Sequence, residues 1–401
     1  MKALNVGIIG CGNISGIYLQ NIPAYRGLTL RACADVRPEV AQAQASRYGT
    51  EAMSVDTLLA REDIDLVVNL TIPSAHFGVS LAALNAGKHV FSEKPLAVDF
   101  EQGRKLVDEA EARGLLLGCA PDTFLGAGGR LARKLVDDGA VGRILSGSAF
   151  LMSHGMEHWH PDPEFFFKPG GGPILDMAPY YLSALVNLIG PVQRVFAMSS
   201  IGFPERIVTS ESPRKGQRIS VETPTTVMAL LEFASGAQVN FCMSWDVWKH
   251  GHPAIELYGT EGSLRVPDPN FFGGHVEISE RGGDWQAKDS SDMPLGAPNW
   301  RSPNWAPDAP SRANYRALGL ADLASAALNG TPHRSTGRLA LHVLEVMHLI
   351  LEGAATGRAM AITTMLERPA ALSDEEAAGL WQGPVDRVRQ VLQSGAAVQG
   401  A

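Results

Sequence analysis

The sequence contains few cysteines and has no excess of positive charge. Its four cysteines, Cys11, Cys33, Cys119 and Cys242, lie far apart, and three of them sit in or beside apolar strand-like runs. Buried free thiols are therefore expected, rather than a disulfide framework or a zinc site. The formal net charge of -8 argues against a nucleic-acid partner, since such a surface needs clustered positive charge.

Targeting segments and long apolar runs are also missing from the sequence. The chain enters a strand-like run directly after Met1, with no cleavable signal pattern, and we find no apolar run long enough to cross a bilayer. No internal repeats occur. A length of 401 residues, of which 45% are hydrophobic, indicates two or three domains with a sizeable core. We therefore expect a cytoplasmic globular protein with no membrane partner.

A glycine turn follows the first predicted strand. Leu4 to Ile9 predicts a buried strand, and it leads into Gly10-Cys11-Gly12-Asn13-Ile14-Ser15. The two glycines permit a tight turn and the close approach of a pyrophosphate, and the next helix would offer its N-terminal amides. Ser15 is small enough for the third position of this motif. The cofactor-binding candidates here are Gly10, Gly12, Asn13 and Ile14.

The next predicted strand ends at a carboxylate. Leu28 to Ala34 runs into Asp35, which is placed to accept hydrogen bonds from an adenosine ribose diol and to repel a 2′-phosphate. This favours NAD over NADP. Arg37, two residues later, could pair with a phosphate, so NADP stays possible.

Strands and helices then alternate as in a parallel sheet. The predicted strands are Asp65 to Leu70, Lys88 to Phe91 and Leu115 to Cys119, and the predicted helices are Pro38 to Tyr48, Ser74 to Ala86 with Ser74 as its cap, and Asp99 to Arg113. The stretch Thr71-Ile72-Pro73-Ser74-Ala75-His76 follows a strand, where Thr71, Pro73 and His76 could line the nicotinamide side of the cofactor. An equally open alternative for His76 is a solvated position in the first turn of a helix.

The chain is organised around Phe91-Ser92-Glu93-Lys94-Pro95-Leu96, where a lysine and a glutamate stand at the end of a strand. In a doubly wound sheet, ligands bind at the carboxyl ends of the strands. Pro95 biases Lys94 toward an extended conformation, which suits a side chain held over a cleft. A surface turn closed by an ion pair is the alternative.

These residues together resemble the glucose–fructose oxidoreductase and inositol dehydrogenase family of nicotinamide-dependent enzymes. The Glu93-Lys94-Pro95 element at this distance from the glycine turn is the specific part, and the likeness extends to about residue 365, through segments 170–180 and 332–337. The resemblance implies a Rossmann domain, then an α/β domain on a large, mostly antiparallel open sheet, with the active site in the cleft between them. It also implies a carbohydrate, polyol or related secondary alcohol as substrate.

The expected domain boundaries follow the change in character near Pro121. We predict a dinucleotide-binding domain over 1–121, a substrate-binding and oligomerisation domain over 122–365, and a C-terminal tail over 366–401. The expected strands of the second domain are Ile144 to Met152, Val192 to Ser199, Thr225 to Phe233, Ala237 to Trp245, Ala254 to Gly259 and Ser263 to Val266. Helices would cover one face of this sheet and a second subunit the other, which predicts a homodimer or homotetramer.

An aromatic-rich stretch lies at 156–172. Trp159 and His160 could line a sugar pocket, where aromatic faces and polar tips are both useful. Two alternatives are a metal site from His154, His158 and His160, which lacks the customary spacing, and loop packing alone. We assign no metal. Residues 267–310, which include Trp305, carry little periodicity and read as a functional loop or an intersubunit arm.

The predicted helix Ile174 to Ile189 places Asp176 and Tyr180 on one face, four residues apart. Many family members carry Asp then His at this spacing, whereas this chain has Tyr180, as does the glucose–fructose oxidoreductase branch. By this resemblance the catalytic residues are Lys94, Asp176 and Tyr180, with Glu93 positioning Lys94, and Glu93 and Lys94 are also cofactor-binding candidates. Either Lys94 or Tyr180 could accept the proton, and a core tyrosine is the alternative for Tyr180. The substrate-binding candidates are Lys94, Asp122, Trp159, His160, Asp176 and Tyr180.

Three functions stay open from the sequence. The first is an NAD(P)-dependent dehydrogenase of a sugar or polyol. The second is a redox-neutral enzyme that keeps its NAD while a glycosidic bond is cleaved, and the third is a non-catalytic dinucleotide sensor. The presence of Lys94, Asp176 and Tyr180 together argues against the sensor, because binding alone does not require all three.

Overall fold

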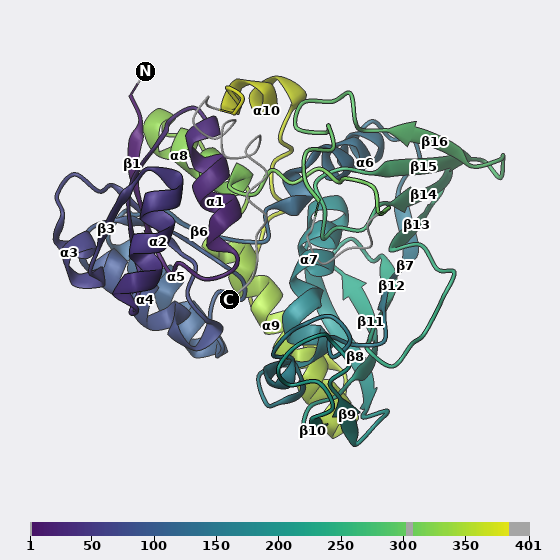
Figure 1. Cartoon of the computed structure of the whole chain (residues 1–401). Helices are drawn as coiled ribbons and strands as arrows, with labels where there is room; N and C mark the ends of the chain where they lie inside the picture. Colours follow the sequence, from purple (N-terminus) through teal and green to yellow (C-terminus); the bar gives the residue numbers. More distant parts are fainter. Residues whose placement is uncertain (1, 302–307, 385–401) are drawn as a thin grey trace. The chain divides into compact units, whose positions relative to one another are not determined.

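The computed structural model describes residues 2–301 and 308–384 and forms two compact units. The first unit contains the residues up to Gly126, the segment Met293–Leu341 and the described residues from Leu372 onward. The second contains Ala127–Asp292 and His342–Ala371. Figure 1 shows both units, with helices and strands labelled where there is room. Trp305 and residues 385–401 of the predicted tail lie outside the described residues.

The first unit is built on a parallel sheet with the order β3-β2-β1-β4-β5-β6. Its strands are β1 (Leu4–Ile9), β2 (Leu28–Ala34), β3 (Glu51–Met53), β4 (Leu66–Asn69), β5 (His89–Ser92) and β6 (Leu117–Cys119). The strand order reverses between β1 and β4, which is the point where doubly wound sheets bind their ligands. The predicted Rossmann topology is confirmed.

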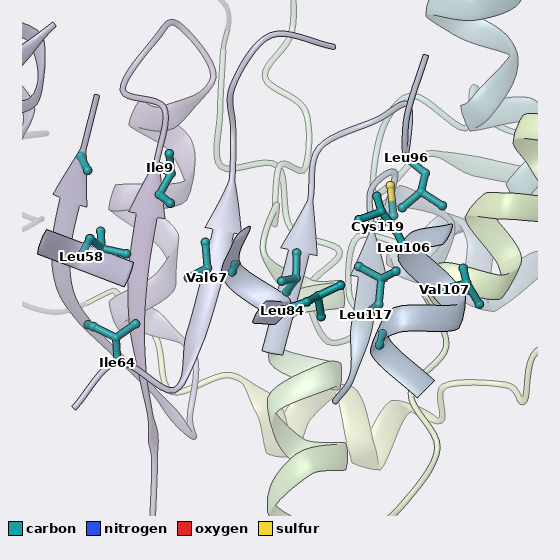
Figure 2. Close-up of a cluster of buried hydrophobic side chains, with 14 of the residues drawn as sticks. Ile9, Leu58, Ile64, Val67, Leu84, Leu96, Leu106, Val107, Leu117 and Cys119 are labelled. Carbon is teal, nitrogen blue, oxygen red and sulfur yellow. The ribbon is translucent and has the colours of Figure 1, made fainter. Parts of the chain in front are cut away.

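Helices connect these strands. They are α1 (Ser15–Asn21), η1 (Ile22–Ala24), α2 (Pro38–Tyr48), α3 (Val55–Ala60), α4 (Pro73–Asn85), α5 (Phe100–Ala112) and η2 (Thr123–Leu125). Leu58 of α3, Leu84 of α4 and Leu106 of α5 bury their side chains in one apolar cluster with Val67 and Leu117 of the sheet (Figure 2). This packing fixes the ends of β1, β4 and β5 relative to one another.

The first unit differs from the sequence prediction in two local features. The prediction of Ser74 as the cap of α4 was wrong, since the helix begins at Pro73 after Ile72 and no side chain caps it. Proline suits this first position, because its missing N–H would have no helical partner. The short elements β3 and α3 were not predicted, because three to six residues give too little periodicity.

The segment Met293–Leu341 and the residues from Leu372 belong to the first unit, which differs from the predicted boundaries at 121 and 365. Helix α8 (Leu318–Asn329) and helix α10 (Asp374–Leu380) supply this packing. The ring of Trp381 meets that of Tyr25 edge-on at 4.8 Å, and the N–H of Arg26 donates to the Leu380 carbonyl at 2.8 Å. The Rossmann domain is thus completed by chain that lies far away in the sequence.

The second unit is built on a nine-stranded mixed sheet with the order β16-β15-β14-β13-β7-β12-β11-β8-β17. Its strands are β7 (Ile144–Met152), β8 (Val192–Ser200), β11 (Thr226–Phe233), β12 (Gln238–Ser244), β13 (Ile255–Gly259), β14 (Gly262–Val266), β15 (His275–Glu280), β16 (Gln286–Asp289) and β17 (Met360–Ala361). Only the pair β7 and β12 is parallel among those described. The predicted large, mostly antiparallel sheet is therefore confirmed. A separate hairpin pairs β9 (Glu205–Ile207) with β10 (Arg218–Ser220).

Helices α6 (Ala127–Asp137) and α7 (Gly172–Ile189) pack on one face of this sheet, and η3 (Glu164–Phe167) precedes α7. Along β11 the residues alternate between buried and exposed, as expected for a sheet covered on one face. The opposite face carries exposed apolar side chains, including Met198 of β8 and Met228 of β11.

The stretch 267–310 is more regular than predicted, because β15 and β16 extend the sheet there. Helix α9 (Gly337–Thr356) also departs from the sequence expectation, since it is long and apolar enough to cross a membrane by length and composition alone. More than half of its apolar window is buried within the protein, as in the core helix of a globular domain.

Candidate active site

The glycine turn connects β1 to α1 in a conformation that needs glycine at its first position. Gly10 has a φ of +100°, and a Cβ there would lie 2.6 Å from the carbonyl oxygen of Leu70. Gly12 is exposed, and a Cβ there would meet nothing within 4 Å. Its backbone therefore faces open space, as close approach by a pyrophosphate requires. The Ser15 hydroxyl donates to the Gly12 carbonyl at 2.7 Å, which fixes the turn.

Asp35 closes the other side of this turn. Its Oδ2 accepts the N–H of Cys11 at 2.8 Å, and its Oδ1 accepts the N–H of Arg37 at 2.9 Å. A carboxylate oxygen can accept more than one hydrogen bond, so both oxygens keep capacity for the two hydroxyls of a ribose. The Arg37 side chain is 62% exposed, with Nε 3.6 Å from Oδ1. The turn and Asp35 together fit NAD; Asn13 and Ile14 lie within the same turn.

His76 is buried and lies between two loops. Its Nδ1 is 2.7 Å from the Pro95 carbonyl oxygen and its Nε2 is 2.9 Å from that of Thr71. The ring therefore connects the loop after β4 to the loop after β5, and this geometry favours a positioning role over a polar contact to the cofactor. Ile72 and Pro73 are exposed beside it, and they offer the apolar surface of this segment.

Glu93 is held from two directions at the end of β5. Its Oε1 accepts the hydroxyl of Tyr18 at 3.0 Å, and its Oε2 accepts the backbone N–H of Lys94 at 3.0 Å. Burial raises the pKa of Tyr18 well above its usual value, so its hydroxyl stays a donor. Lys94 itself is half-buried and precedes a cis bond to Pro95. Glu93 thus fixes the backbone from which the Lys94 side chain extends.

Asp122, which we predicted as a substrate contact, lies in a buried position. Its side chain is buried, and Oδ2 accepts the N–H of Gly319 at 2.9 Å near the start of α8. Burial raises the pKa of Asp122 to about 6. These contacts favour a packing role for Asp122 over direct binding of substrate.

Helix α7 carries the two predicted catalytic residues of the second unit. Asp176 is half-buried and Tyr180 is buried, and four residues of continuous helix place them on one face, even though Pro179 lies between them. Gly172 begins the helix with a φ of +92°. The expected one-turn spacing of a carboxylate and a phenol is thus present.

The aromatic loop, residues 153–171, connects β7 to α7. Trp159 is 42% exposed, and its ring meets that of His160 edge-on at 5.4 Å. Burial lowers the pKa of His160, while the nearby charges of Asp162 and Asp176 oppose that shift. Because the charge of Asp176 acts on His160, the aromatic loop and α7 place these two side chains near one another.

His154 and His160 of the aromatic loop contact aromatic rings. Among residues 2–301 and 308–384, no group of three or more His, Cys, Asp or Glu side chains is arranged to hold one. His154 instead stacks on Trp248, with ring centroids 3.3 Å apart.

Sequence reasoning missed Tyr18 and Arg206, which support the predicted site residues. Tyr18 reads as an apolar helix residue, and its partner Glu93 is 75 positions away. Arg206 lies on β9, in a stretch to which we assigned no element. Neither gives a local signal, because both act through contacts formed only in the folded chain.

Two family models match most of the chain. Residues 4–120 match the oxidoreductase family with the NAD-binding Rossmann fold, and residues 130–265 match the GFO/IDH/MocA C-terminal domain. Together these matches cover candidate site residues in each of the two units.

Similar proteins include several dehydrogenases. The chain is 32% identical to inositol 2-dehydrogenase of Rhizobium meliloti, over 64% of this chain and 74% of that protein. It is 29% identical to levoglucosan dehydrogenase of Pseudarthrobacter phenanthrenivorans, over 66% of this chain and 73% of that protein.

Solved structures show the same fold. A levoglucosan dehydrogenase in complex with NADH and L-sorbose matches with a TM-score of 0.76 and 23% identity, covering 91% of this chain and all of that one. The glycine turn, Asp35 and Glu93-Lys94-Pro95 stand within the matched Rossmann region, and Asp176 and Tyr180 stand within the matched C-terminal region. The chain therefore belongs to the GFO/IDH/MocA family of oxidoreductases and carries an NAD-binding Rossmann domain.

Proposed function

We propose that this oxidoreductase oxidises a secondary hydroxyl of a sugar, inositol or related polyol to the ketone, with NAD as the acceptor. The observation that carries the proposal is the position of Lys94. It is the second residue after β5, and its backbone is fixed by Glu93, which also accepts a hydrogen bond from Tyr18 of the helix after the glycine turn. Ligands bind at the carboxyl ends of the strands in such a sheet, and a lysine held there suits proton transfer to or from a hydroxyl.

The cofactor and the side chains have separate roles in the proposed oxidation. When bound, NAD supplies the nicotinamide carbon that takes the hydride from the alcohol carbon. Lys94 contacts the reacting hydroxyl and works with Tyr180 to accept its proton, so the oxygen keeps its electron pair and forms the carbonyl. Asp176 orients the substrate or the lysine. In the reverse direction the same groups return the proton.

The aromatic loop supports a carbohydrate substrate. The exposed face of Trp159 can cover the C–H face of a sugar ring, and His160 offers a polar tip beside it. Relatives named for inositol and levoglucosan support the same class of substrate.

The test is reduction of NAD and, separately, of NADP, measured by absorbance with a panel of aldoses, inositols, sugar acids and anhydrosugars. Lys94→Met should lower turnover by about a hundredfold to ten-thousandfold, since it removes a proton-transfer group. Lys105→Met, an exposed lysine on α5, is the matched control and should keep wild-type turnover. Wild-type turnover in the Lys94 variant would refute the assignment.

The same assay separates the alternatives. A cofactor that co-purifies tightly, with product formed but no net reduced nicotinamide, would favour the redox-neutral cleavage of a glycosidic bond. Cofactor binding without turnover of any compound in the panel would favour the sensor.

We further propose that the chain forms a homodimer or homotetramer through the nine-stranded sheet. Directly paired positions on β8 and β11, Phe196 with Leu230 and Met198 with Met228, are exposed apolar side chains. A second copy of this face would cover them, as symmetric sheet interfaces do. Light scattering after size-exclusion chromatography would measure the mass.

We also propose the cytoplasm as the compartment. The support is that the cysteines are buried free thiols, which is usual for reducing compartments. Cell fractionation would test the location.

A further inference from the structure

Arg206 is a buried arginine in the short strand β9. Its side chain is only 3% exposed. A buried guanidinium is costly unless opposite charges and carbonyl oxygens satisfy it, so its partners show what it holds together.

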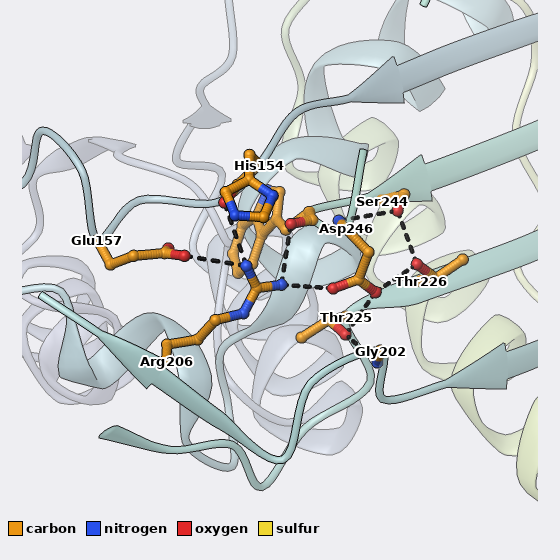
Figure 3. A network of polar contacts seen from close by, with 9 residues as sticks. His154, Glu157, Gly202, Arg206, Thr225, Thr226, Ser244 and Asp246 are labelled. Carbon is orange, nitrogen blue, oxygen red and sulfur yellow. Dashed lines mark hydrogen bonds and ion pairs between the residues drawn. The ribbon is translucent and has the colours of Figure 1, made fainter. Parts of the chain in front are cut away.

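The guanidinium binds two carboxylates and two backbone carbonyls (Figure 3). Nη1 donates to Oε1 of Glu157 at 2.9 Å and to the His154 carbonyl at 3.3 Å. Nη2 donates to the Trp245 carbonyl at 3.0 Å and to the Asp246 carboxylate. Arginine is suited to this arrangement, because its planar fork presents several donors in fixed directions.

These partners come from two segments that leave the sheet at the same end. Residues 153–157 follow β7, and Trp245 and Asp246 follow β12, the parallel neighbour of β7 with Met152 opposite Ser244. Thr225 and Thr226 donate to Oδ2 of Asp246 at 2.7 and 2.6 Å, so Asp246 is itself fixed to the sheet. Arg206 therefore connects the start of the aromatic loop to a rigid part of the second unit.

The chain that follows β9 binds the same loop again. The N–H groups of Thr209 and Ser210 donate to the Glu157 carbonyl at 2.8 and 3.0 Å, and the Ser210 hydroxyl donates to the His160 carbonyl at 2.8 Å. These contacts lie on either side of Trp159. The orientation of Trp159 and His160 thus depends on the hairpin that Arg206 anchors.

Two aromatic rings also contact the Arg206 guanidinium. The guanidinium carbon of Arg206 lies 4.8 Å from the ring centre of Phe203 and 5.6 Å from that of Phe167, which precedes α7. Both distances suit cation–π attraction. One arginine therefore contacts the beginning of the aromatic loop, at His154 and Glu157, and its end, at Phe167.

We propose that Arg206 is a positioning residue for substrate, which sets the geometry of the aromatic loop that presents Trp159 and His160 to the sugar and leads into α7. This inference rests on the proposed function, since it assigns the loop to the carbohydrate. Arg206 acts through the loop and has no role in binding the cofactor, which belongs to the first unit.

The test compares Arg206→Gln and Arg206→Lys with Arg218→Gln. Arg218 is the control because it lies on the partner strand β10 with a 68% exposed side chain paired to Glu205. In Arg206→Gln the KM for the polyol should rise about tenfold to a hundredfold, as for a misplaced binding group, while the KM for NAD stays within about twofold of wild type. Arg206→Lys should give a smaller rise, because it restores the charge without the fork.

Hydrogen–deuterium exchange supplies a readout that does not depend on turnover. Peptides from 153–171 should exchange faster in Arg206→Gln, whereas peptides from 4–119 should match wild type. An unchanged polyol KM in a folded Arg206→Gln, or unchanged exchange in the loop, would overturn the inference. If Arg206→Gln did not fold, the Lys variant and Glu157→Gln would carry the same comparison.

The proposed function and the role of Arg206 can be refuted separately. Absence of turnover by the wild-type protein across the panel would refute the proposed function, and with it the role of the loop in binding sugar. Normal wild-type turnover, with equal polyol KM values in the Arg206 variants and Arg218→Gln, would refute only the role of Arg206.

Discussion

The hydroxyl of Tyr18 donates a hydrogen bond to Glu93 at 3.0 Å, and the other oxygen of Glu93 accepts the N–H of Lys94. Tyr18 lies on α1, the helix that follows the glycine turn. The pair therefore connects the helix next to the NAD-binding turn with the loop of the proposed catalytic lysine. A change in the position of α1 should therefore alter the position of the Lys94 loop, and the reverse.

Replacing Tyr18 with phenylalanine removes this donor without changing the shape of the ring. A hydrogen bond to a charged group contributes about 1.5–3 kcal/mol, so kcat should fall about tenfold to a hundredfold if the bond holds Lys94 in its working position. The dissociation constant for NAD should change much less. Steady-state kinetics and titration of NAD binding would measure both.

Tyr25→Phe is the control for this experiment. The Tyr25 hydroxyl is also buried in the first unit and donates to the Tyr315 carbonyl at 2.6 Å. Its loss removes a buried hydrogen bond without touching Glu93. Equal losses of kcat in the two variants would indicate a general loss of stability and would contradict the link to Lys94.

Cofactor choice should depend on the charge of Asp35. Asp35→Asn keeps an oxygen for the N–H of Cys11 but removes the charge that repels a 2′-phosphate, and Arg37 stays available to pair with that phosphate. The ratio of kcat/KM for NAD to that for NADP should fall by about tenfold or more, since a charged contact is worth upward of 1.4 kcal/mol.

Asp65→Asn provides the matched control, because Asp65 also accepts a backbone N–H, that of Asn5, at 2.8 Å. This variant should keep the wild-type ratio. An unchanged ratio in Asp35→Asn would mean that other groups select the cofactor.

The first half of the fold could be predicted because its signals are local. The turn from Gly10 and the carboxylate at Asp35 each follow an apolar run whose bounds, Leu4–Ile9 and Leu28–Ala34, the structure reproduces. Buried parallel strands are continuous apolar stretches, and glycine marks where they end. The positions of the site residues in the Rossmann unit could therefore be predicted from the ends of its strands.

The supporting contacts could not be predicted, because they join distant positions. Arg206 and Asp246 are 40 residues apart, and Gly319 meets Asp122 across 197 residues. The packing of α8 and α10 on the first unit has the same origin, because the apolar face of a helix does not show in the sequence which surface that helix will cover. The sequence alone does not show whether a carboxylate such as Asp122 binds substrate or accepts an N–H in the first turn of a helix.

The exposed face of the nine-stranded sheet predicts a change of oligomeric state on mutation. Met228→Asp places a charge in the apolar ladder opposite Met198, where a second copy would bury it. Burying an unpaired charge is unfavourable, so the measured mass should shift toward the monomer. Met365→Asp, an exposed methionine outside this ladder, should leave the mass unchanged. A wild-type mass for Met228→Asp would place the interface elsewhere.

The stability of the second unit should depend on His342 of α9. The N–H of Val192 donates to Nε2 of His342 at 3.1 Å, so Nε2 carries no proton, and Nδ1 lies 2.8 Å from the hydroxyl of Thr364. The ring is fully buried, and this burial lowers the pKa of His342 to about 4 from an ordinary 6.5. The native protein thus holds this histidine neutral.

Acid should therefore destabilise the protein between pH 6.5 and pH 4. In this window the unfolded chain binds a proton at His342 and the folded chain does not, so the free energy of unfolding falls as the pH falls. The contribution is complete above pH 6.5 and amounts to about 3 kcal/mol for a pKa difference of this size. Urea unfolding at pH 7 and pH 4.5 would measure it.

His342→Gln should remove the part of this pH dependence that His342 contributes, because the amide oxygen can accept the Val192 N–H without titrating. His275→Gln changes an exposed histidine on β15 and should leave the dependence as in wild type. If the free energy of His342→Gln fell with acid as steeply as that of the wild type, the loss would arise from other groups. A less steep profile would instead show that this buried ring, held between Val192 of β8 and Thr364, contributes to the acid sensitivity of the second unit.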